Sequence, residues 1–345
     1  MDNFSKLIQQ FDYQFPQELI AQEPARPRDS AKLIIYNKTT QEIDHDIYKN
    51  LWRYLPKDGV LVLNKTKVLP ARLIVSKQTG GKVKLLYIKA ENNLIWFLSN
   101  NKLTIGSVLS VNKKISFQVT SHDKQFYILK PSFKVSLIFD VLNKFGETPL
   151  PPYIKHSPLK GKKLLTEYNT VFANKLGSVA APTASLHFTK KLLDKILKSG
   201  VSIKYVTLHV NLGTFASLNP EQLKSKTLHT EYYEIDKSTA KFLNKAKKSN
   251  RPIIAVGTTV VRTLESACDN TKKITKLSGG TNLFITENYK LKFVDQLITN
   301  FHVPKSSLLM LVSTFVTRKK LLALYKLAIK NKYRLFSFGD GMLIK

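Results

Sequence analysis

Short runs of alternating apolar and polar residues recur between Ala71 and Lys130, and turn residues such as Thr79-Gly80-Gly81 separate them. Strands this short and this closely spaced are typical of a small antiparallel barrel or sandwich. The expected strands span residues 71–76, 82–89, 94–99, 107–111, 115–120 and 126–130. This part of the chain is therefore expected to form a compact β domain.

After Pro149 the pattern changes to an alternation of helices and strands. Thr189 can cap a helix that ends at Gly200, because apolar residues recur at helical spacing between these two positions. The pattern also predicts strands over 201–210, 253–256, 283–286 and 334–338, and helices over 258–267, 306–316 and 319–330. This order is typical of a layered α/β domain with some parallel strands.

The segments on either side of the β domain indicate how it is attached. Val60 to Leu63 is expected to be a buried strand that ends at Asn64, and residues 136–144 are expected to form a helix that Gly146 closes. The proline-rich segment 149–153 is stiff and suits a return to the first domain. The predicted fold is a discontinuous α/β catalytic domain, residues 1–68 and 150–345, interrupted by a small antiparallel β-barrel domain, residues 69–149.

Length and composition fit this organisation. The chain has 345 residues, which exceeds the usual size of one core, and its hydrophobic content of 43% is ordinary for a globular protein. Apolar stretches such as Ser307 to Val316 are too short to span a bilayer, and the residues after Met1 do not resemble a signal peptide. The single cysteine, Cys268, excludes an intramolecular disulfide and fits a reducing compartment. We therefore expect a cytoplasmic protein without membrane association.

The net charge of +31 suggests a polyanionic partner, because lysines and arginines that neutralise phosphates release condensed counterions. Only eight of the 55 basic residues are arginines, and the other 47 are lysines. A lysine excess of this kind can equally reflect an AT-rich genome. The few arginines are the sharper signal, because lysine cannot replace a guanidinium group at a bidentate site.

Several common catalytic signatures are absent from the sequence. There is no Walker-type phosphate loop, no Gly-x-Gly-x-x-Gly after a predicted strand, and no set of cysteines and histidines with zinc-binding spacing. We therefore expect neither a bound metal nor an ordinary dinucleotide cofactor.

Polar clusters at the predicted ends of strands are the remaining candidates. Small residues from Ser178 to Thr189 surround His187, and would let a ligand approach the backbone at the start of a helix. Gly257-Thr258-Thr259 is a strand-to-helix turn with Arg262 one turn further, which could bind a carboxylate or a phosphate. Both clusters have structural alternatives, since His187 could be a capping residue and Arg262 could lie on the surface.

Three further clusters contain histidines. His209 lies near the end of a predicted strand, and His229 and Glu231 share one face if their segment is extended. Asn300 and His302 lie between an apolar run and a helix, where ligands often bind in α/β folds. A lone histidine on a strand is more often a hydrogen-bonded structural residue, and His229 with Glu231 could be a solvated pair. The occurrence of all these clusters in one half of the chain favours a common site.

Taken in order, these motifs resemble the family of S-adenosylmethionine:tRNA ribosyltransferase-isomerases of queuosine biosynthesis. The matching segments are residues 11–13, 19–22, 27–29, 70–72, 79–83, 149–154, 179–189, 207–210, 256–265, 299–309 and 333–344. They extend over nearly the whole chain, and the expected barrel diverges most. The resemblance also implies an α/β domain interrupted by a β-barrel.

The resemblance implies an unusual use of S-adenosylmethionine, as a ribosyl donor and not a methyl donor. The ribosyl group is transferred to 7-aminomethyl-7-deazaguanine at the wobble position of a tRNA with a GUN anticodon. It rearranges to an epoxycyclopentane, which gives epoxyqueuosine and releases adenine and methionine. S-adenosylmethionine is a co-substrate in this reaction, no cofactor is permanently bound, and we expect a monomer.

This reaction makes specific demands on the site. The sulfonium acidifies the adjacent C5′ protons, so a general base is needed, and the methionine carboxylate needs an anion site. We hypothesise that His187 or His209 is the base and that His229 and Glu231 form a second acid/base pair. Arg262, Thr258 and Thr259 would hold the carboxylate or a tRNA phosphate, and His302, Arg334 and Asp340 would complete the pocket. The other expected substrate-binding residues are Thr183, Asn300, Arg28 and Arg72.

Two other classes of function compete with this interpretation. A non-catalytic RNA-binding protein could use the barrel and the basic surface, but the barrel strands lack an aromatic-rich stacking pattern. A conventional methyltransferase would need a glycine-rich turn after a first strand, which is missing here.

Overall fold

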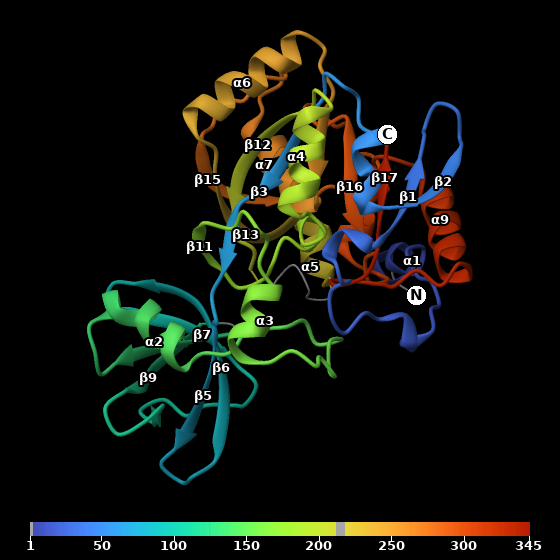
Figure 1. The fold of residues 1–345 in the computed structure, drawn as a ribbon. Helices are drawn as coiled ribbons and strands as arrows, with labels where there is room; N and C mark the ends of the chain where they lie inside the picture. The colour runs from blue at the N-terminus through green and yellow to red at the C-terminus, as the bar shows by residue number, and fades with distance from the viewer. Residues whose placement is uncertain (1–2, 124, 212–217) are drawn as a thin grey trace.

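Within residues 3–123, 125–211 and 218–345, which the computed structural model describes, nine strands form one mixed sheet (Figure 1). In their order across the sheet the strands are β15 (Ser278–Leu283), β13 (Thr227–Glu234), β12 (Ser202–Leu208), β3 (Val60–Asn64), β14 (Ile253–Val256), β16 (Gln296–Asn300), β17 (Gly341–Ile344), β1 (Lys32–Tyr36) and β2 (Ile43–Ile47). Segments from before and after the barrel therefore meet in one sheet.

The centre of this sheet is parallel, as the alternation of helices and strands predicted. β3 pairs in parallel with both β12 and β14, and β14 pairs in parallel with β16. The other neighbours of β12 and β16 are antiparallel. The carboxyl ends of four adjacent strands consequently lie at the same edge of the sheet, which is where ligands bind in open α/β folds.

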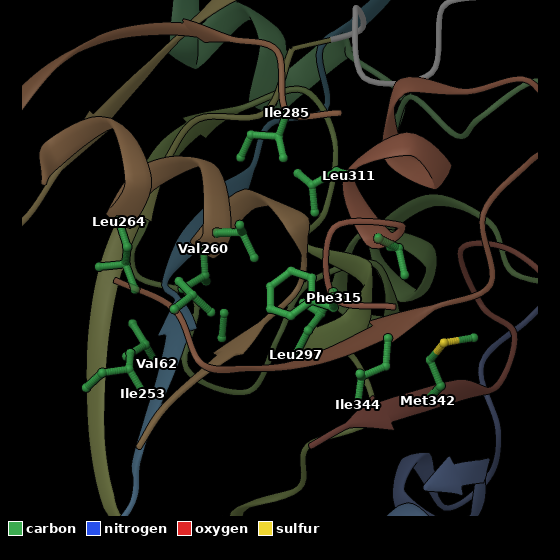
Figure 2. Packing of buried hydrophobic residues seen from close by; sticks show 14 of the residues in the cluster. Val62, Ile253, Val260, Leu264, Ile285, Leu297, Leu311, Phe315, Met342 and Ile344 are labelled. Atoms are coloured by element: carbon green, nitrogen blue, oxygen red, sulfur yellow. The ribbon is translucent and has the colours of Figure 1, made fainter. Parts of the chain in front are cut away.

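Both faces of the sheet are covered, and the continuous apolar run of β3 is the reason. Val60 and Val62 belong to one buried cluster, whereas Leu61 and Leu63 belong to another, since successive side chains of a strand point to opposite faces. The first face packs against α6 (Lys237–Lys248), α7 (Thr258–Ala267), α8 (Ser307–Val312) and α9 (Arg318–Lys330), as Figure 2 shows in part. The second packs against α4 (Lys190–Lys198) and the 3-10 helix η3 (Tyr48–Arg53). The result is a three-layered α/β domain.

A second body is a closed antiparallel barrel, which projects from one end of the layered domain (Figure 1). Its described strands are β5 (Arg72–Lys77), β6 (Lys82–Glu91), β7 (Leu94–Ser99), β8 (Val108–Ser110), β9 (Ser116–Asp123) and β10 (Phe126–Pro131). Leu73, Phe97 and Phe117 are fully buried inside it. Helix α2 (Ile138–Phe145) packs against the same core. The predicted fold class is therefore confirmed, and the six expected barrel strands are all present.

The two bodies are joined by a small parallel ribbon. β4 (Thr66–Val68) leads toward the barrel and pairs with β11 (Lys175–Ser178), which lies on the return path. The remaining described elements are the helices α1 (Asn3–Gln9), α3 (Gly161–Glu167) and α5 (Pro220–Ser225) and the 3-10 helices η1 (Gln17–Leu19), η2 (Arg28–Ser30), η4 (Val135–Leu137) and η5 (Thr183–Ser185).

Three predicted elements of the second half were wrong. A strand was expected over 283–286, but β15 ends at Leu283, and Phe284 and Ile285 pack into the core instead of pairing. The strand expected over 334–338 is absent, because Phe336 adopts a left-handed backbone conformation (φ 69°) that interrupts extended structure.

The helix expected over 306–316 stops at Val312. Ser313 and Thr314 each donate a side-chain hydrogen bond to a carbonyl three residues earlier, at 2.6 and 2.7 Å. These bonds satisfy helix-end carbonyls, so the chain can leave the helix while Phe315 and Val316 stay buried.

Replacing Gly146 with alanine should destabilise the joint between the bodies. An added Cβ would lie 1.8 Å from the carbonyl oxygen of Pro70, and backbone cannot yield as a flexible side chain does. We expect a loss of about 1–3 kcal/mol in the free energy of unfolding, measured by urea denaturation. Gly81→Ala is the control, because no atom lies within 4 Å of its added Cβ. Equal stability of the two variants would contradict the packing at Pro70.

Candidate functional site

A cleft lined by apolar residues and several polar ones opens at the carboxyl edge of the parallel strands. It encloses about 580 Å³ of empty space, including solvent at its mouth. Val210 follows β12, Gly257 follows β14, and Asn300 ends β16, so three of the four parallel strands deliver residues to it. Of the residues expected from sequence, Thr183, Thr258, Thr259, Asn300 and His302 lie together in its lining. The polar clusters that the sequence analysis placed in one half of the chain thus contribute these five residues to a single cleft.

The start of α7 forms a wall of the cleft that is suited to an anion. Gly257 has a left-handed φ of 89°, which turns the chain from β14 directly into the helix. The first N–H groups of a helix have no acceptor within it, and those of Thr258 and Thr259 belong to this turn. Within the described residues the Thr259 hydroxyl is buried and makes no hydrogen bond. The cleft therefore contains unused donors beside the positive end of a helix dipole.

His302 is the histidine that lines this cleft. Its Nε2 lies 2.8 Å from the Thr299 hydroxyl, and its backbone N–H donates to the Tyr325 hydroxyl at 2.8 Å. Tyr13 donates to its carbonyl oxygen, so the main chain is held on both sides. Burial lowers the pKa of His302 to about 4, because the charged imidazolium is disfavoured away from water. The ring is consequently neutral near pH 7 and able to accept a proton.

His187 does not reach the cleft. The side chain is 2% exposed and stacks on the Tyr48 ring with centroids 4.3 Å apart. Its Nε2 lies 3.3 Å from the side-chain nitrogen of Asn300, which does line the cleft. Burial, followed by the charge of Arg334, lowers the pKa of His187 to about 3. The position of His187 therefore does not support the expectation that it is the general base, and its ring instead contacts Asn300 from behind the cleft lining.

His209 lies in a different groove, at the ribbon between the two bodies. Its Nδ1 is 2.9 Å from the Thr66 hydroxyl, and an added Cβ on Gly177 would come within 2.8 Å of its ring. Burial lowers its pKa, with Glu234 opposing the shift and Lys175 adding to it. Thr66 belongs to β4 and Gly177 to β11. This histidine connects the ribbon to the sheet, so its predicted role as base is not supported by its position.

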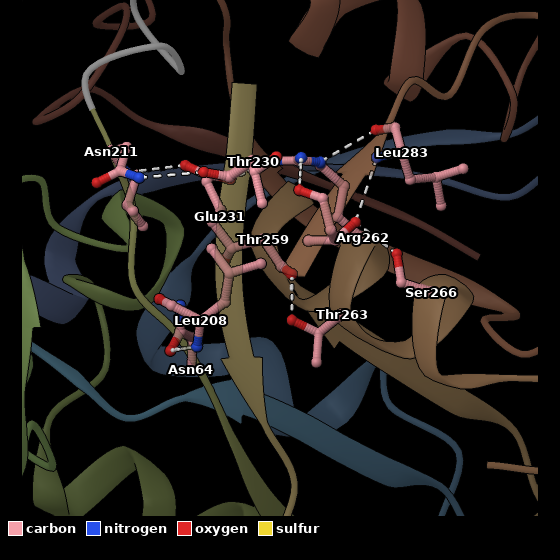
Figure 3. Close-up of polar contacts among 12 residues, drawn as sticks. Asn64, Leu208, Asn211, Thr230, Glu231, Thr259, Arg262, Thr263, Ser266 and Leu283 are labelled. Carbon is pink, nitrogen blue, oxygen red and sulfur yellow. Dashed lines mark hydrogen bonds and ion pairs between the residues drawn. The ribbon is translucent and has the colours of Figure 1, made fainter. Parts of the chain in front are cut away.

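Glu231 and Arg262 form a buried ion pair behind the cleft (Figure 3). The guanidinium group also donates to the carbonyl oxygens of Thr281 and Leu283, each at 3.2 Å. Glu231 further accepts the backbone N–H of Asn211 at 2.9 Å. The charge of Arg262 is thus neutralised inside the protein, and its position behind the cleft does not support the expectation that it holds a substrate anion. An anion would have to compete with a buried carboxylate.

The predicted acid/base pair of His229 and Glu231 is also not formed. His229 is exposed, whereas Glu231 is 2% exposed and committed to Arg262. Both residues border a small hollow that adjoins the main cleft, since Leu308 lines the two. His229 and Glu231 therefore lie next to the candidate site, but they are not paired with each other as an acid and a base.

The other predicted arginines have structural partners. Arg28 donates to the carbonyl oxygens of Thr166, Glu167 and Asn169, and so caps the end of α3. Arg72 donates to the Leu150 carbonyl oxygen at 3.4 Å, at the joint with the barrel.

Arg334 pairs with Asp340, and neither lines the cleft. Asp340 is 1% exposed and accepts the backbone N–H groups of Lys32 and Arg334 at 3.0 and 2.8 Å. These contacts join β1 to the loop before β17. Neither residue is placed to touch a ligand in the cleft, contrary to expectation.

Three cleft residues were missed by the sequence analysis. Tyr153 and Ser337 line the cleft and hydrogen-bond through their hydroxyls at 2.7 Å, and Thr299 orients His302. Tyr153 ends the proline-rich segment 149–153, which was interpreted only as a connector. Ser337 lay in a wrongly expected strand. Tyr153 is next to Pro152, and Ser337 lies shortly before Gly339. Both positions are in segments that match the resembled family, and this match could have indicated them as site residues.

Neither a metal centre nor a membrane span is found in the described part of the chain. No group of three or more histidine, cysteine, aspartate or glutamate side chains is placed to hold a metal ion there. Among the same residues, no helix combines the length and apolar character that crossing a membrane requires.

The fold and the cleft define a class, an α/β protein with a cleft at the carboxyl edge of its sheet and an attached closed β-barrel. The chain belongs to the family of queuosine biosynthesis proteins, whose sequence profile matches residues 8–344. This confirms the resemblance drawn from the motifs.

Individual relatives are similar over their full length. S-adenosylmethionine:tRNA ribosyltransferase-isomerase of Carboxydothermus hydrogenoformans is 43% identical over 341 residues, which cover 98% of this chain and 99% of that protein. The protein of the same name from Clostridium kluyveri is 42% identical over 348 residues, with 98% and 99% covered. The crystal structure of S-adenosylmethionine tRNA ribosyltransferase from Thermotoga maritima has a TM-score of 0.57 and 33% identity, covering 97% of this chain and 100% of that one.

Replacing His187 with glutamine should weaken the loss of stability in acid. The folded state holds this pKa at about 3, whereas an unfolded histidine titrates near 6.5. As pH falls below about 6.5, only the unfolded state binds the proton, so the free energy of unfolding decreases by up to about 1.4 kcal/mol per pH unit. Urea denaturation between about pH 7 and pH 5 should give a shallower slope for His187→Gln than for the wild type. An unchanged slope would show that His187 is not buried in its neutral form.

Proposed function

We propose that this chain is an S-adenosylmethionine:tRNA ribosyltransferase-isomerase. It transfers the ribosyl moiety of S-adenosylmethionine to 7-aminomethyl-7-deazaguanine at the tRNA wobble position and isomerises it, with release of adenine and methionine. The observation that carries the proposal is the 43% identity to a relative of that name, over 98% of this chain and 99% of the relative. The cleft at the strand ends supports it, because this reaction needs a pocket for the co-substrate.

The first chemical demand is a base for a C5′ proton of the ribose. The neighbouring positive sulfonium acidifies this proton, and removal leaves a carbanion stabilised by sulfur. His302 is our candidate base, because it lines the cleft and burial keeps its pKa near 4. A base must be unprotonated before it acts, and this pKa satisfies that condition at neutral pH. Thr299 would hold the ring in place through Nε2.

The second demand is an anion site for the methionine carboxylate. The N-terminal turn of α7 offers backbone N–H groups and the unpartnered hydroxyl of Thr259. Thr183 and Asn300 are hydrogen-bonded to each other at 3.0 Å in the same lining, and would contact the remaining polar groups of the co-substrate. The α7 turn would therefore bind the carboxylate without Arg262, which the sequence analysis had included in this anion site.

The finer points of the proposal concern the partner and the setting. The tRNA would carry a GUN anticodon, S-adenosylmethionine would be the only additional small molecule required, and the enzyme would act as a cytoplasmic monomer. The chain would divide into a catalytic domain of residues 1–68 and 150–345 and an inserted barrel domain of residues 69–149. The closed barrel and the single large sheet support that division.

Incubation with S-adenosylmethionine and tRNA that carries 7-aminomethyl-7-deazaguanine tests the reaction. We expect adenine and methionine in equal amounts, together with a mass increase on the tRNA, measured by liquid chromatography and mass spectrometry. S-adenosylhomocysteine as the product would instead identify a methyltransferase. Binding of the tRNA without any turnover would identify an RNA-binding protein.

Replacing His302 with glutamine should lower the rate of adenine release by about 10²–10⁴, the usual contribution of a general base. His122→Gln is the matched control, because His122 is exposed on the barrel and far from the cleft in sequence and structure. The wild-type kcat/KM should be independent of pH above about pH 6 and should decline as the pH falls toward the His302 pKa of about 4, where the ring becomes protonated. A near-normal rate for His302→Gln would remove this residue from the base role.

A further inference from the structure

A dense cationic segment lies at the rim of the cleft. We call residues 155–163 the basic strap, and its cations are Lys155, His156, Lys160, Lys162 and Lys163, where His156 counts only when protonated. All five side chains are exposed, and no acidic residue occurs between positions 155 and 165. Tyr153, two residues before the strap, lines the cleft itself. The charges therefore begin immediately outside the candidate active site.

The strap is held in place by buried contacts. Gln22 donates to the carbonyl oxygen of Tyr153 at 3.3 Å and accepts the backbone N–H of His156 at 2.9 Å. Ile154 and Leu159 are 7% and 4% exposed and belong to one small core cluster. An ordered backbone of this kind keeps the lysine stems close to fixed positions, so binding a ligand would order less chain.

The positive charge of the strap is not compensated by its neighbours in the described structure. Glu167, the acidic residue nearest to the strap in the following sequence, pairs with Arg28. The four strap lysines form no ion pair among the described residues. Four uncompensated ammonium groups within nine residues produce a local positive potential that attracts a polyanion.

We propose that the basic strap binds the phosphate backbone of the RNA next to the nucleotide that enters the cleft. The inference rests on the proposed function, because it takes tRNA as the substrate. Lysines serve this purpose as point charges that contact phosphates without reading the sequence. The strap would thereby set the register of the RNA so that the wobble nucleotide faces the cleft.

Helix α6 provides an internal comparison. Its end leads into β14 through Arg251, and it carries the exposed Lys241, Lys245 and Lys248, which the exposed Lys272 joins in the groove at that end. The carboxyl end of α6 thus lies at the amino ends of the strands, opposite the cleft, while α3 and the strap lie beside the barrel (Figure 1). The two sets have equal charge and different positions relative to the site.

The test compares two quadruple variants with the same reduction in net charge. In the strap variant Lys155, Lys160, Lys162 and Lys163 become glutamine, and in the control Lys241, Lys245, Lys248 and Lys272 become glutamine. Binding of fluorescein-labelled tRNA carrying 7-aminomethyl-7-deazaguanine is measured by anisotropy between about 50 and 200 mM salt. Thermal unfolding establishes that both variants are folded.

We expect the strap variant to bind the tRNA at least tenfold more weakly than the control at low salt. The slope of log K against log salt should become shallower by about 1 for each phosphate that the variant no longer neutralises. The KM for tRNA in the adenine-release assay should rise accordingly. Equal weakening in both variants would overturn the proposal, because it would show a response to net charge alone. Wild-type protein without turnover would instead refute the proposed function, whereas turnover with an unaffected strap variant would refute only the strap.

Discussion

The parallel pairing of β12, β3, β14 and β16 is the constraint on which the rest of the molecule depends. It aligns the carboxyl ends of these strands, so that the turns after them converge although they are separated by many residues in the chain. Asn64 stabilises this edge directly, since its side chain bonds to both the N–H and the carbonyl of Leu208 (Figure 3). A strand end that is tied to its neighbour cannot shift without moving the cleft.

His302 and His187 differ in their position relative to the cleft. His302 and His187 are both kept neutral by desolvation, but only His302 borders the cleft, and His187 instead positions Asn300 from behind. A neutral ring that contacts ligand space can accept a proton, whereas one enclosed by Tyr48 can only donate or accept a fixed hydrogen bond. The pKa values of both histidines are lowered, so what distinguishes His302 as a candidate base is its access to the cleft.

The arginines and lysines also differ in their access to a ligand. The arginines that were expected to meet the substrate are satisfied internally, by the carboxylate of Glu231, by Asp340 or by carbonyl groups at the end of α3. Buried guanidinium groups need partners, and the fold supplies them. The positive charge available to an RNA is then lysine on exposed segments, among which the basic strap stands at the rim of the cleft.

The sequence by itself determined the architecture and the family. Alternation with period two and close turns identified all six barrel strands, and the continuous apolar run at 60–63 identified the central strand of the sheet. The motif set identified the family because its members recur in order along the chain. These features are local or ordered along the chain, so no knowledge of tertiary contacts is needed to recognise them.

Only the tertiary structure decided which polar residues form the site. Thr183, Thr258, Thr259, Asn300 and His302 lie together in the cleft lining, whereas Arg262 is paired with Glu231, 31 positions away in the chain. Whether a guanidinium or an imidazole faces a ligand depends on which segments pack over it, and sequence spacing contains no information about such long-range partners. The sequence therefore located the site at the strand ends, while packing selected its members.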